Sequence, residues 1–240
     1  MFEFLFDNIW ITLAVLSVGF SAFALKKIDL VGAIAGVALA FSIWYGAGDG
    51  ALLTLFLFFV FGTAVSSWKK KQKEKMQLEQ ENQGKRTITH VLANGGTALI
   101  IAAIAITVES SNFPFGLLIA ASFATACSDT FSSELGNVYG TKYFNIMTGK
   151  KAKRGPDGVV SLAGFAFGLV GSLIIALGWW AFDHDYTNLL LITSSGLLGN
   201  VMDSILGATW QRKGWINNHQ VNFIATLSGS LIALFFSMIM

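Results

Sequence analysis

Two aspartates stand out because each lies inside an otherwise apolar stretch of this 240-residue chain. An unpaired carboxylate within a membrane span costs about 2.5–3.5 kcal/mol on insertion scales, so such residues usually face a cavity and mark function. Two carboxylates at one membrane level suit Mg²⁺, which prefers one or two carboxylates together with phosphate and water oxygens. We therefore predict that Asp129 and Asp203 are catalytic metal ligands. The alternative is that both lie at the membrane interface, where they meet water or pair with lysine.

Glu134 is predicted as a third catalytic and metal-binding carboxylate, on one condition. It follows Asp129 by five residues, which is about 140° round an ideal helix. It can therefore join the site only if the helix ends or unwinds there. The three histidines are scattered, and no His/Cys ligand spacing is present, so the sequence does not favour zinc. The single cysteine, Cys127, is interpreted as a packing residue.

A basic, glycine-rich segment at 148–161 precedes an apolar stretch. Glycines let backbone amides approach a phosphate, a helix start offers free N–H groups, and Lys or Arg neutralises the charge. The spacing of a P-loop is absent. The alternative is a basic loop that serves only membrane topology. The sequence predicts a set of residues that bind nucleotide or phosphate, three of them at the starts of other helices. The set is Asn94, Gly95, Lys150, Lys153, Arg154, Gly155, Asp157, Gly158, Ser161 and Asn222.

The elements that must position these residues are membrane helices. Hydrophobic residues make up 54% of the chain and charged residues 12%, about half the charge of a soluble domain. Eight apolar stretches of about 17–24 residues are each long enough to cross a ~30 Å hydrocarbon layer. We therefore predict an all-α, polytopic membrane protein, and we exclude a secreted disulfide scaffold, a nucleic-acid-binding domain and an ordinary cytosolic enzyme. The stretches are 8–25, 30–47, 51–68, 88–108, 114–133, 159–182, 187–208 and 220–240.

The charges predict how the chain is oriented in the membrane. All sixteen Lys and Arg residues fall in alternate connections. The charged residues of the intervening connections are all acidic, namely Asp49, Glu109, Asp183 and Asp185. Basic residues stay on the cytoplasmic side because they resist translocation. Both termini are therefore predicted outside and the basic loops in the cytoplasm, in the inner or plasma membrane of the cell. Three parts are expected: scaffold helices at 1–68, a basic cytoplasmic loop at 69–87 and a five-helix catalytic core at 88–240.

The last five stretches carry polar residues at their cytoplasmic ends. The fifth and seventh run in the same direction and share a small, polar helical face that ends in an aspartate, which indicates a weakly repeated helical hairpin. The shared pattern is Ser122, Thr125 and Asp129 in one stretch, and Gly196, Gly199 and Asp203 in the other. We expect the aspartates, Glu134 and Asn222 to approach one cytoplasm-facing cavity with Asn94 on its wall. The glycines at 164, 168 and 171 are interpreted as a helix-packing stripe.

Several blocks together resemble the integral membrane family called domain of unknown function ninety-two, which includes transmembrane protein nineteen and the phytyl-phosphate kinases. The resemblance implies a CTP-dependent kinase that converts an isoprenoid monophosphate, such as phytyl phosphate, to the diphosphate. It also implies three partners: the lipid bilayer, an isoprenoid phosphate lipid and a nucleoside triphosphate. The blocks are 91–96, 124–136, 155–164, 203–211 and 221–223.

Two other functions remain open at this point. Paired carboxylates and glycine-rich helices also suit a transporter or flippase of an anionic metabolite or lipid. A structural membrane subunit would leave Asp129 and Asp203 unexplained. A transporter should carry polar residues through its full depth, whereas here they cluster at the cytoplasmic ends. The sequence leaves open the chain length of the lipid, the nucleotide base and whether the protein forms a homo-oligomer.

Overall fold

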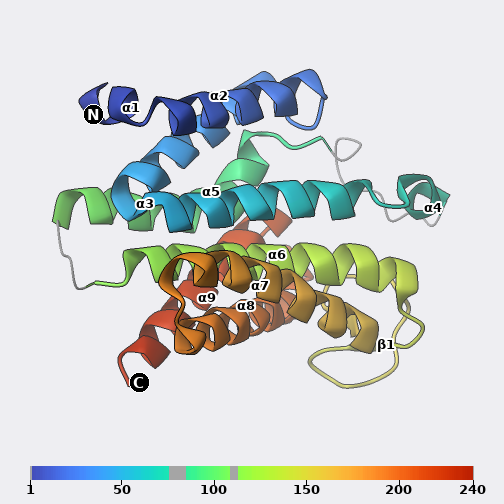
Figure 1. Cartoon of the computed structure of the whole chain (residues 1–240). Coiled ribbons are helices and arrows are strands. Elements are labelled where there is room, and N and C mark those ends of the chain that lie inside the picture. The colour runs from blue at the N-terminus through green and yellow to red at the C-terminus, as the bar shows by residue number, and fades with distance from the viewer. Residues whose placement is uncertain (1, 76–84, 109–112, 240) are drawn as a thin grey trace.

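The computed structural model describes residues 2–75, 85–108 and 113–239 (Figure 1). Within these ranges the chain is almost entirely helical and has one small β-hairpin. The elements are α1 (Phe2–Asp7), α2 (Ile9–Ala24), α3 (Leu30–Ser67), α4 (Lys70–Lys75), α5 (Ile88–Val108), α6 (Phe115–Tyr139), β1 (Tyr143–Asn145), β2 (Val159–Ser161), α7 (Leu162–Asp183), α8 (Tyr186–Leu206), the π-helical turn η2 (Gly207–Gln211) and α9 (Asn218–Ser237).

The protein is a polytopic helical membrane protein, as predicted. Within the described ranges, six helical segments are long and apolar enough to cross a membrane, namely α3, α5, α6, α7, α8 continued through η2, and α9. The apolar helix α2 is shorter, at 16 residues. Every predicted stretch is helical over most of its length. The number of crossings and the side on which the basic loops lie stay predictions.

The long helix α3 covers both the second and the third predicted stretches. Its 38 residues would extend about 57 Å if straight, far more than a ~30 Å hydrocarbon layer. The helix is broken at Gly48, whose φ of 78° and ψ of −172° are not helical. Glycine adopts such a positive φ without the steric penalty of a Cβ atom. The break therefore divides α3 into two arms at the place where the sequence predicted a connection.

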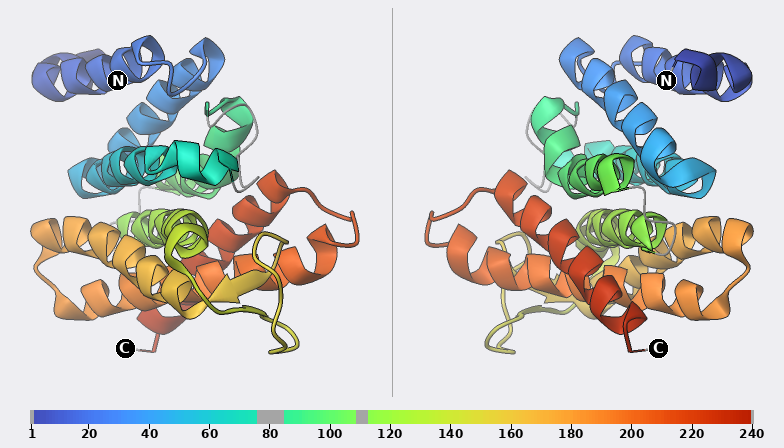
Figure 2. Two further views of the ribbon diagram at one scale, coloured as in Figure 1. Left: turned by 90° about the vertical axis from the view of Figure 1, so that its right-hand side faces the viewer. Right: turned by 90° about the vertical axis from the view of Figure 1, so that its left-hand side faces the viewer.

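Helix α6 lies at the centre of the bundle, with α3 and α5 on one side and α7, α8 and α9 on the other (Figure 2). Small residues bring α7 close to it. A Cβ atom at Gly171 would lie 2.7 Å from the carbonyl oxygen of Cys127, and one at Gly136 would lie 2.7 Å from the Cα atom of Gly164. These contacts confirm that the glycines of α7 serve close helix packing.

The connections with basic residues gather at one end of the bundle, where α4 and the hairpin lie (Figure 1). Ile28 forms an isolated parallel bridge with Arg86, and the Nζ atom of Lys27 donates to the hydroxyl of Ser67 at 2.9 Å. These bonds join the connection after α2 to the end of α3 and to the segment before α5. Residues 76–84 of the basic loop, and Glu109, lie outside the described residues. The three-part division of the chain stays a prediction.

Candidate functional site

A polar cavity of about 470 Å³ lies at this end of the bundle. Its volume is within the range of ligand sites, about 300–1,000 Å³. Its walls come from the end of α3, the segment before α5 and the start of α5, the end of α6, the β-hairpin with its loop, the end of α8 with η2, and the start of α9. Segments far apart in the sequence therefore contribute their polar ends to one space. The predicted site residues that line it are Asn94, Asp129, Gly155, Asp157, Gly158, Ser161, Asp203 and Asn222.

Asp129 and Asp203 reach the same cavity because α6 and α8 pack closely. A Cβ atom at Gly199 would overlap the side chain of Thr125, so the two helices approach one full turn before their aspartates. The amide of Asn222, in the orientation that satisfies its neighbours, donates to Oδ2 of Asp203 at 3.2 Å. Helix α9 thereby fixes one carboxylate. The shared small faces predicted for the fifth and seventh stretches are thus the faces through which these helices pack.

The two carboxylates line the same cavity. Asp129 and Asp157 both lie near enough to Asp203 for like-charge repulsion. Neither Asp129 nor Asp203 forms an ion pair within 2–75, 85–108 and 113–239. The alternative that they pair with lysine therefore finds no support in the described part of the chain. The arrangement favours binding of a cation in the cavity.

The donor set determines which metal could fit. Among the residues that the structure describes, no group of three or more His, Cys, Asp or Glu side chains could hold a metal ion. A zinc site built from three or four protein ligands therefore does not fit these residues. Mg²⁺ takes one or two carboxylates and leaves its other positions to water and ligand phosphates. Asp129 and Asp203 fit that requirement.

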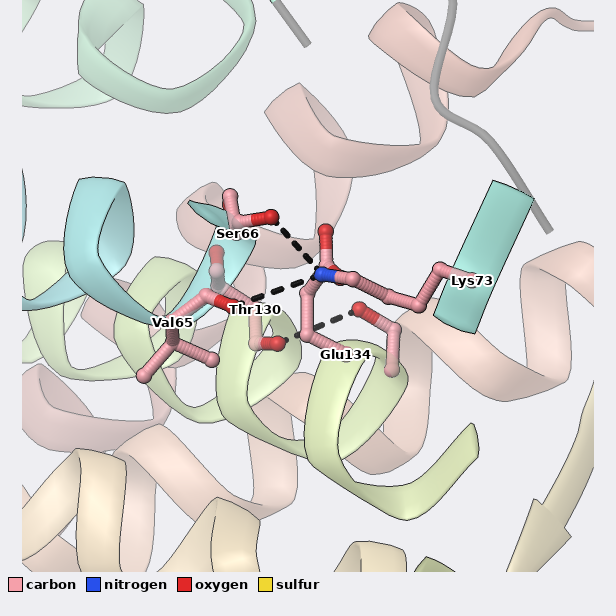
Figure 3. A network of polar contacts seen from close by, with 6 residues as sticks. Val65, Ser66, Lys73, Thr130 and Glu134 are labelled. Carbon is pink, nitrogen blue, oxygen red and sulfur yellow. Dashed lines mark hydrogen bonds and ion pairs between the residues drawn. The ribbon is translucent and has the colours of Figure 1, made fainter. Parts of the chain in front are cut away.

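Glu134 does not lie where its predicted role as a third metal ligand requires. Helix α6 remains regular to Tyr139, so the condition that would have turned Glu134 toward Asp129 is not met. Its carboxylate instead forms a buried ion pair with Lys73 of α4 (Figure 3). The Nζ atom of Lys73 also donates to the carbonyl oxygen of Ser66 at 2.7 Å. Glu134 is therefore placed as a structural anchor between α6 and the segment after α3.

The β-hairpin loop forms one wall of the cavity. Strands β1 and β2 are antiparallel, with Tyr143 opposite Ser161, and the loop between them returns through a turn in which the N–H of Val159 donates to the carbonyl oxygen of Pro156 at 3.1 Å. Arg212 holds this turn from outside, because its Nε donates to the carbonyl oxygen of Asp157 at 2.7 Å. Burial raises the pKa of the Asp157 carboxyl above its usual value, and the charge of Arg212 opposes that rise.

The basic side chains of the loop do not line the cavity as expected. Lys150, Lys153 and Arg154 are exposed, and Nη1 of Arg154 donates to the carbonyl oxygen of Asn137 at 3.1 Å. They lie on the outer side of the loop because the turn presents its glycines inward. Ser161 does line the cavity, and its hydroxyl caps α7 by accepting from Gly164 N at 3.0 Å.

Gly95 also departs from its predicted role. A Cβ atom there would overlap the side chain of Leu39. Gly95 therefore packs α5 against α3, while its neighbour Asn94 reaches the polar cavity.

Gly158 should be sensitive to substitution because of its contact with η2. Its φ is 69°, and a Cβ atom would overlap the backbone of Ala208. Overpacking of this kind costs about 1–3 kcal/mol, so we expect Gly158→Ala to weaken ligand binding in the cavity roughly tenfold, which corresponds to about 1.4 kcal/mol. The control is Gly149→Ala, which also has a positive φ, of 65°, but meets no atom within 4 Å. Equal losses in both variants, measured by ligand titration, would contradict a role for the Ala208 contact.

Among the cavity-wall residues that the sequence analysis did not predict are Arg86, His90 and His219. The rings of His90 and His219 are 4.8 Å apart and perpendicular. Arg86 was counted among the basic residues that set topology. A signal was present, because Arg86, His90 and Asn94 are spaced four residues apart, the spacing that places side chains on one helix face.

Comparison with known proteins places the chain among integral membrane proteins. The family model described as "Integral membrane protein DUF92" matches residues 13–230. An uncharacterized membrane protein of Methanocaldococcus jannaschii is 34% identical over 219 residues, which are 89% of this chain and 88% of that protein. One of Synechocystis is 32% identical over 80% of this chain and 76% of its own length. The chloroplastic protein VTE6 of Arabidopsis thaliana is 30% identical over 83% of this chain and 63% of its own length. No solved structure matches the chain.

Proposed function

This chain belongs to the DUF92 family of integral membrane proteins, and from that premise we propose that it is a CTP-dependent kinase of an isoprenoid monophosphate. The observation that carries the proposal is the pairing of Asp129 and Asp203 in a polar cavity at one end of the bundle. The resemblance of the sequence blocks to the phytyl-phosphate kinases supports the class of substrate. Phosphoryl transfer suits such a site, because it needs mainly positioning and charge neutralisation from the protein.

The residues of the cavity have separate proposed roles. Asp129 and Asp203 would hold Mg²⁺, with Asn222 orienting the second carboxylate. When bound, the ion would neutralise charge on the transferring phosphate. Gly155 and Gly158 both line the cavity, and a glycine allows the backbone to approach a phosphate chain closely.

The proposed reaction is balanced without an additional reactant. An oxygen of the lipid monophosphate attacks the γ-phosphorus of CTP and forms a new P–O–P linkage. The bond from the γ-phosphorus to its bridging oxygen breaks, and CDP leaves with that electron pair. The nucleophile is an ionised phosphate oxygen, so no side chain has to remove a proton from it.

The depth of the cavity favours an enzyme over the alternative of a transporter. Its walls use only the ends of the helices, whereas a transporter site lies near the bilayer midplane between two access routes. Within the bundle, apolar side chains such as Ile119 of α6 and Ile192 of α8 are fully buried. We propose that the cavity faces the cytoplasm from the inner or plasma membrane, because the basic connections gather at the same end.

The decisive experiment uses purified protein in detergent with γ-labelled CTP, Mg²⁺ and a panel of prenyl monophosphates. We expect label to appear in a prenyl diphosphate and to disappear when the metal is chelated. ATP and GTP in parallel reactions test the choice of nucleotide. Absence of labelled lipid with all three nucleotides, from protein that elutes as a single folded species, would overturn the proposed function.

A further inference from the structure

A second cavity, of about 590 Å³, lies between α2, the two arms of α3 and the start of α5. Its walls are almost entirely apolar, with residues such as Val15, Val18, Leu52 and Phe56. On the second arm of α3 the lining runs from Asp49 to Phe59, which is about 15 Å along a helix. An elongated, apolar space of this kind suits a hydrocarbon chain.

Three residues line both cavities, namely Arg86, His90 and Asn94. The apolar cavity therefore ends where the polar cavity begins. A molecule with an apolar tail in the first and a charged head at these residues would present its head to Asp129 and Asp203.

Arg86 places a positive charge at this junction, and no hydrogen-bond acceptor among the described residues binds its guanidinium. Its guanidinium lies 5.1 Å from the ring of Phe58 and against Gly62, where a Cβ atom would be 2.9 Å from Nη2. Glu134 lies near enough to this guanidinium only for electrostatic attraction. Arginine has five N–H donors in a planar arrangement that matches phosphate oxygens.

We propose that this apolar cavity holds the isoprenoid chain of the acceptor lipid and that Arg86 binds its monophosphate. The inference rests on the proposed kinase function for the identity of the lipid, but the site itself is argued from the two connected cavities. The ionisable residues of the apolar cavity are Asp49, Arg86 and His90. Asp49 lies at the opposite end from Arg86 and accepts from the indole N–H of Trp44 at 2.7 Å. An anionic head group is therefore attracted to the Arg86 end and repelled from the other.

Photo-crosslinking tests the location of the lipid without depending on turnover. The probe is phytyl phosphate with a diazirine near the end of its chain, added to the full-length protein in detergent without nucleotide. We expect peptides of α2 and α3 to be labelled and excess phytyl phosphate to compete better than phytol, which lacks the phosphate. Labelling confined to other helices would overturn the inference. Labelling of α2 and α3 in a protein that phosphorylates no lipid would leave this site standing and overturn only the kinase function.

Variants of Arg86 test the head-group contact. Hydrogen bonds to charged groups predict a loss of roughly 10- to 150-fold in phytyl phosphate affinity for Arg86→Gln. Arg86→Lys should recover part of the loss, because it keeps the charge but not the planar arrangement of donors. Competition by phytol, which carries no charge, should be unchanged in both variants. An unchanged affinity for phytyl phosphate in Arg86→Gln would remove Arg86 from the site.

A blocking variant tests the chain-binding cavity. Gly36 lines it, and a Cβ atom there would meet nothing within 4 Å, so Gly36→Phe introduces a ring into open space. We expect at least a tenfold fall in crosslinking yield with the phytyl probe relative to a probe with a short, two-unit prenyl chain. The matched control is Ala38→Phe, on the exposed face of the same helix, which should leave that ratio unchanged. An identical ratio in both variants would contradict the assignment of the cavity.

Discussion

Replacing Asp203 or Asp129 with asparagine should lower turnover by about 100-fold or more while the protein stays folded. Loss of a residue that only supports a metal ligand typically costs 10–100-fold, so loss of a ligand should reach at least the upper end of that range. A 100-fold loss corresponds to about 2.7 kcal/mol of transition-state stabilisation. Stability should not fall, because a carboxylate within a span opposes insertion and here repels its neighbour.

The measurement is the initial rate of lipid phosphorylation at several Mg²⁺ concentrations, together with the melting temperature in detergent. Asp185→Asn is the matched control, because Asp185 caps α8 by accepting from Thr187 N at 2.7 Å and asparagine caps equally well. It should leave both quantities unchanged. If Asp203→Asn keeps a wild-type rate across the Mg²⁺ series, this carboxylate is not an essential ligand.

Replacing Glu134 with glutamine should destabilise the fold instead of abolishing the chemistry. The side chains of Glu134 and Lys73 are only 6% and 7% exposed, and removal of one partner from a buried ion pair costs about 3–5 kcal/mol because the other charge stays buried. For a chain of this length that corresponds to a melting temperature lower by roughly 6–20 °C. The measurement is the fraction of monodisperse protein that remains after heating. The rate per folded molecule at low temperature should stay near the wild-type rate.

A double variant distinguishes an anchor from a metal ligand. Lys73→Met with Glu134→Leu replaces the pair by apolar side chains of similar size, a change that is often neutral or stabilising. We expect it to restore the melting temperature that Glu134→Gln loses. If Glu134→Gln melts like the wild type but loses Mg²⁺-dependent turnover, Glu134 acts at the metal and its placement as an anchor is wrong.

The sequence predicted Asp129, Asp203 and Asn222 in one cavity because a polar residue inside an apolar stretch needs a reason to be there. That reasoning depends only on composition and helical spacing, which also predicted where the apolar helices lie. It failed for Glu134 because the partner, Lys73, lies 61 residues away in a loop whose charges already had an explanation in topology. Arg86 was missed for the same reason. A basic residue that sets the orientation of the chain in the membrane can also line a cavity. The packed structure is needed to tell which of these two roles the residue has.

The glycine-rich loop shows a second limit of prediction from sequence. Its composition predicted a phosphate site with lysines and Arg154 pointing inward. The short pairing of β1 with β2 and the turn at Pro156 place the glycines at the cavity and the basic side chains outside it. Such a reversal depends on backbone dihedral angles, including the positive φ of Gly155 and Gly158. Residue types alone do not determine which face of a loop points inward.

Helix α2 is the least firmly attached wall of the apolar cavity. Ala22 is the one fully buried residue among the described residues of this helix, and α2 packs mainly on α3. Elements with few buried contacts open locally at low free energy. We expect amide hydrogens of α2 to exchange well before those of α6, and a lipid to pass sideways between α2 and α3 directly from the bilayer. The supply of acceptor would then depend on its mole fraction and lateral diffusion in the membrane, and not on its concentration in water.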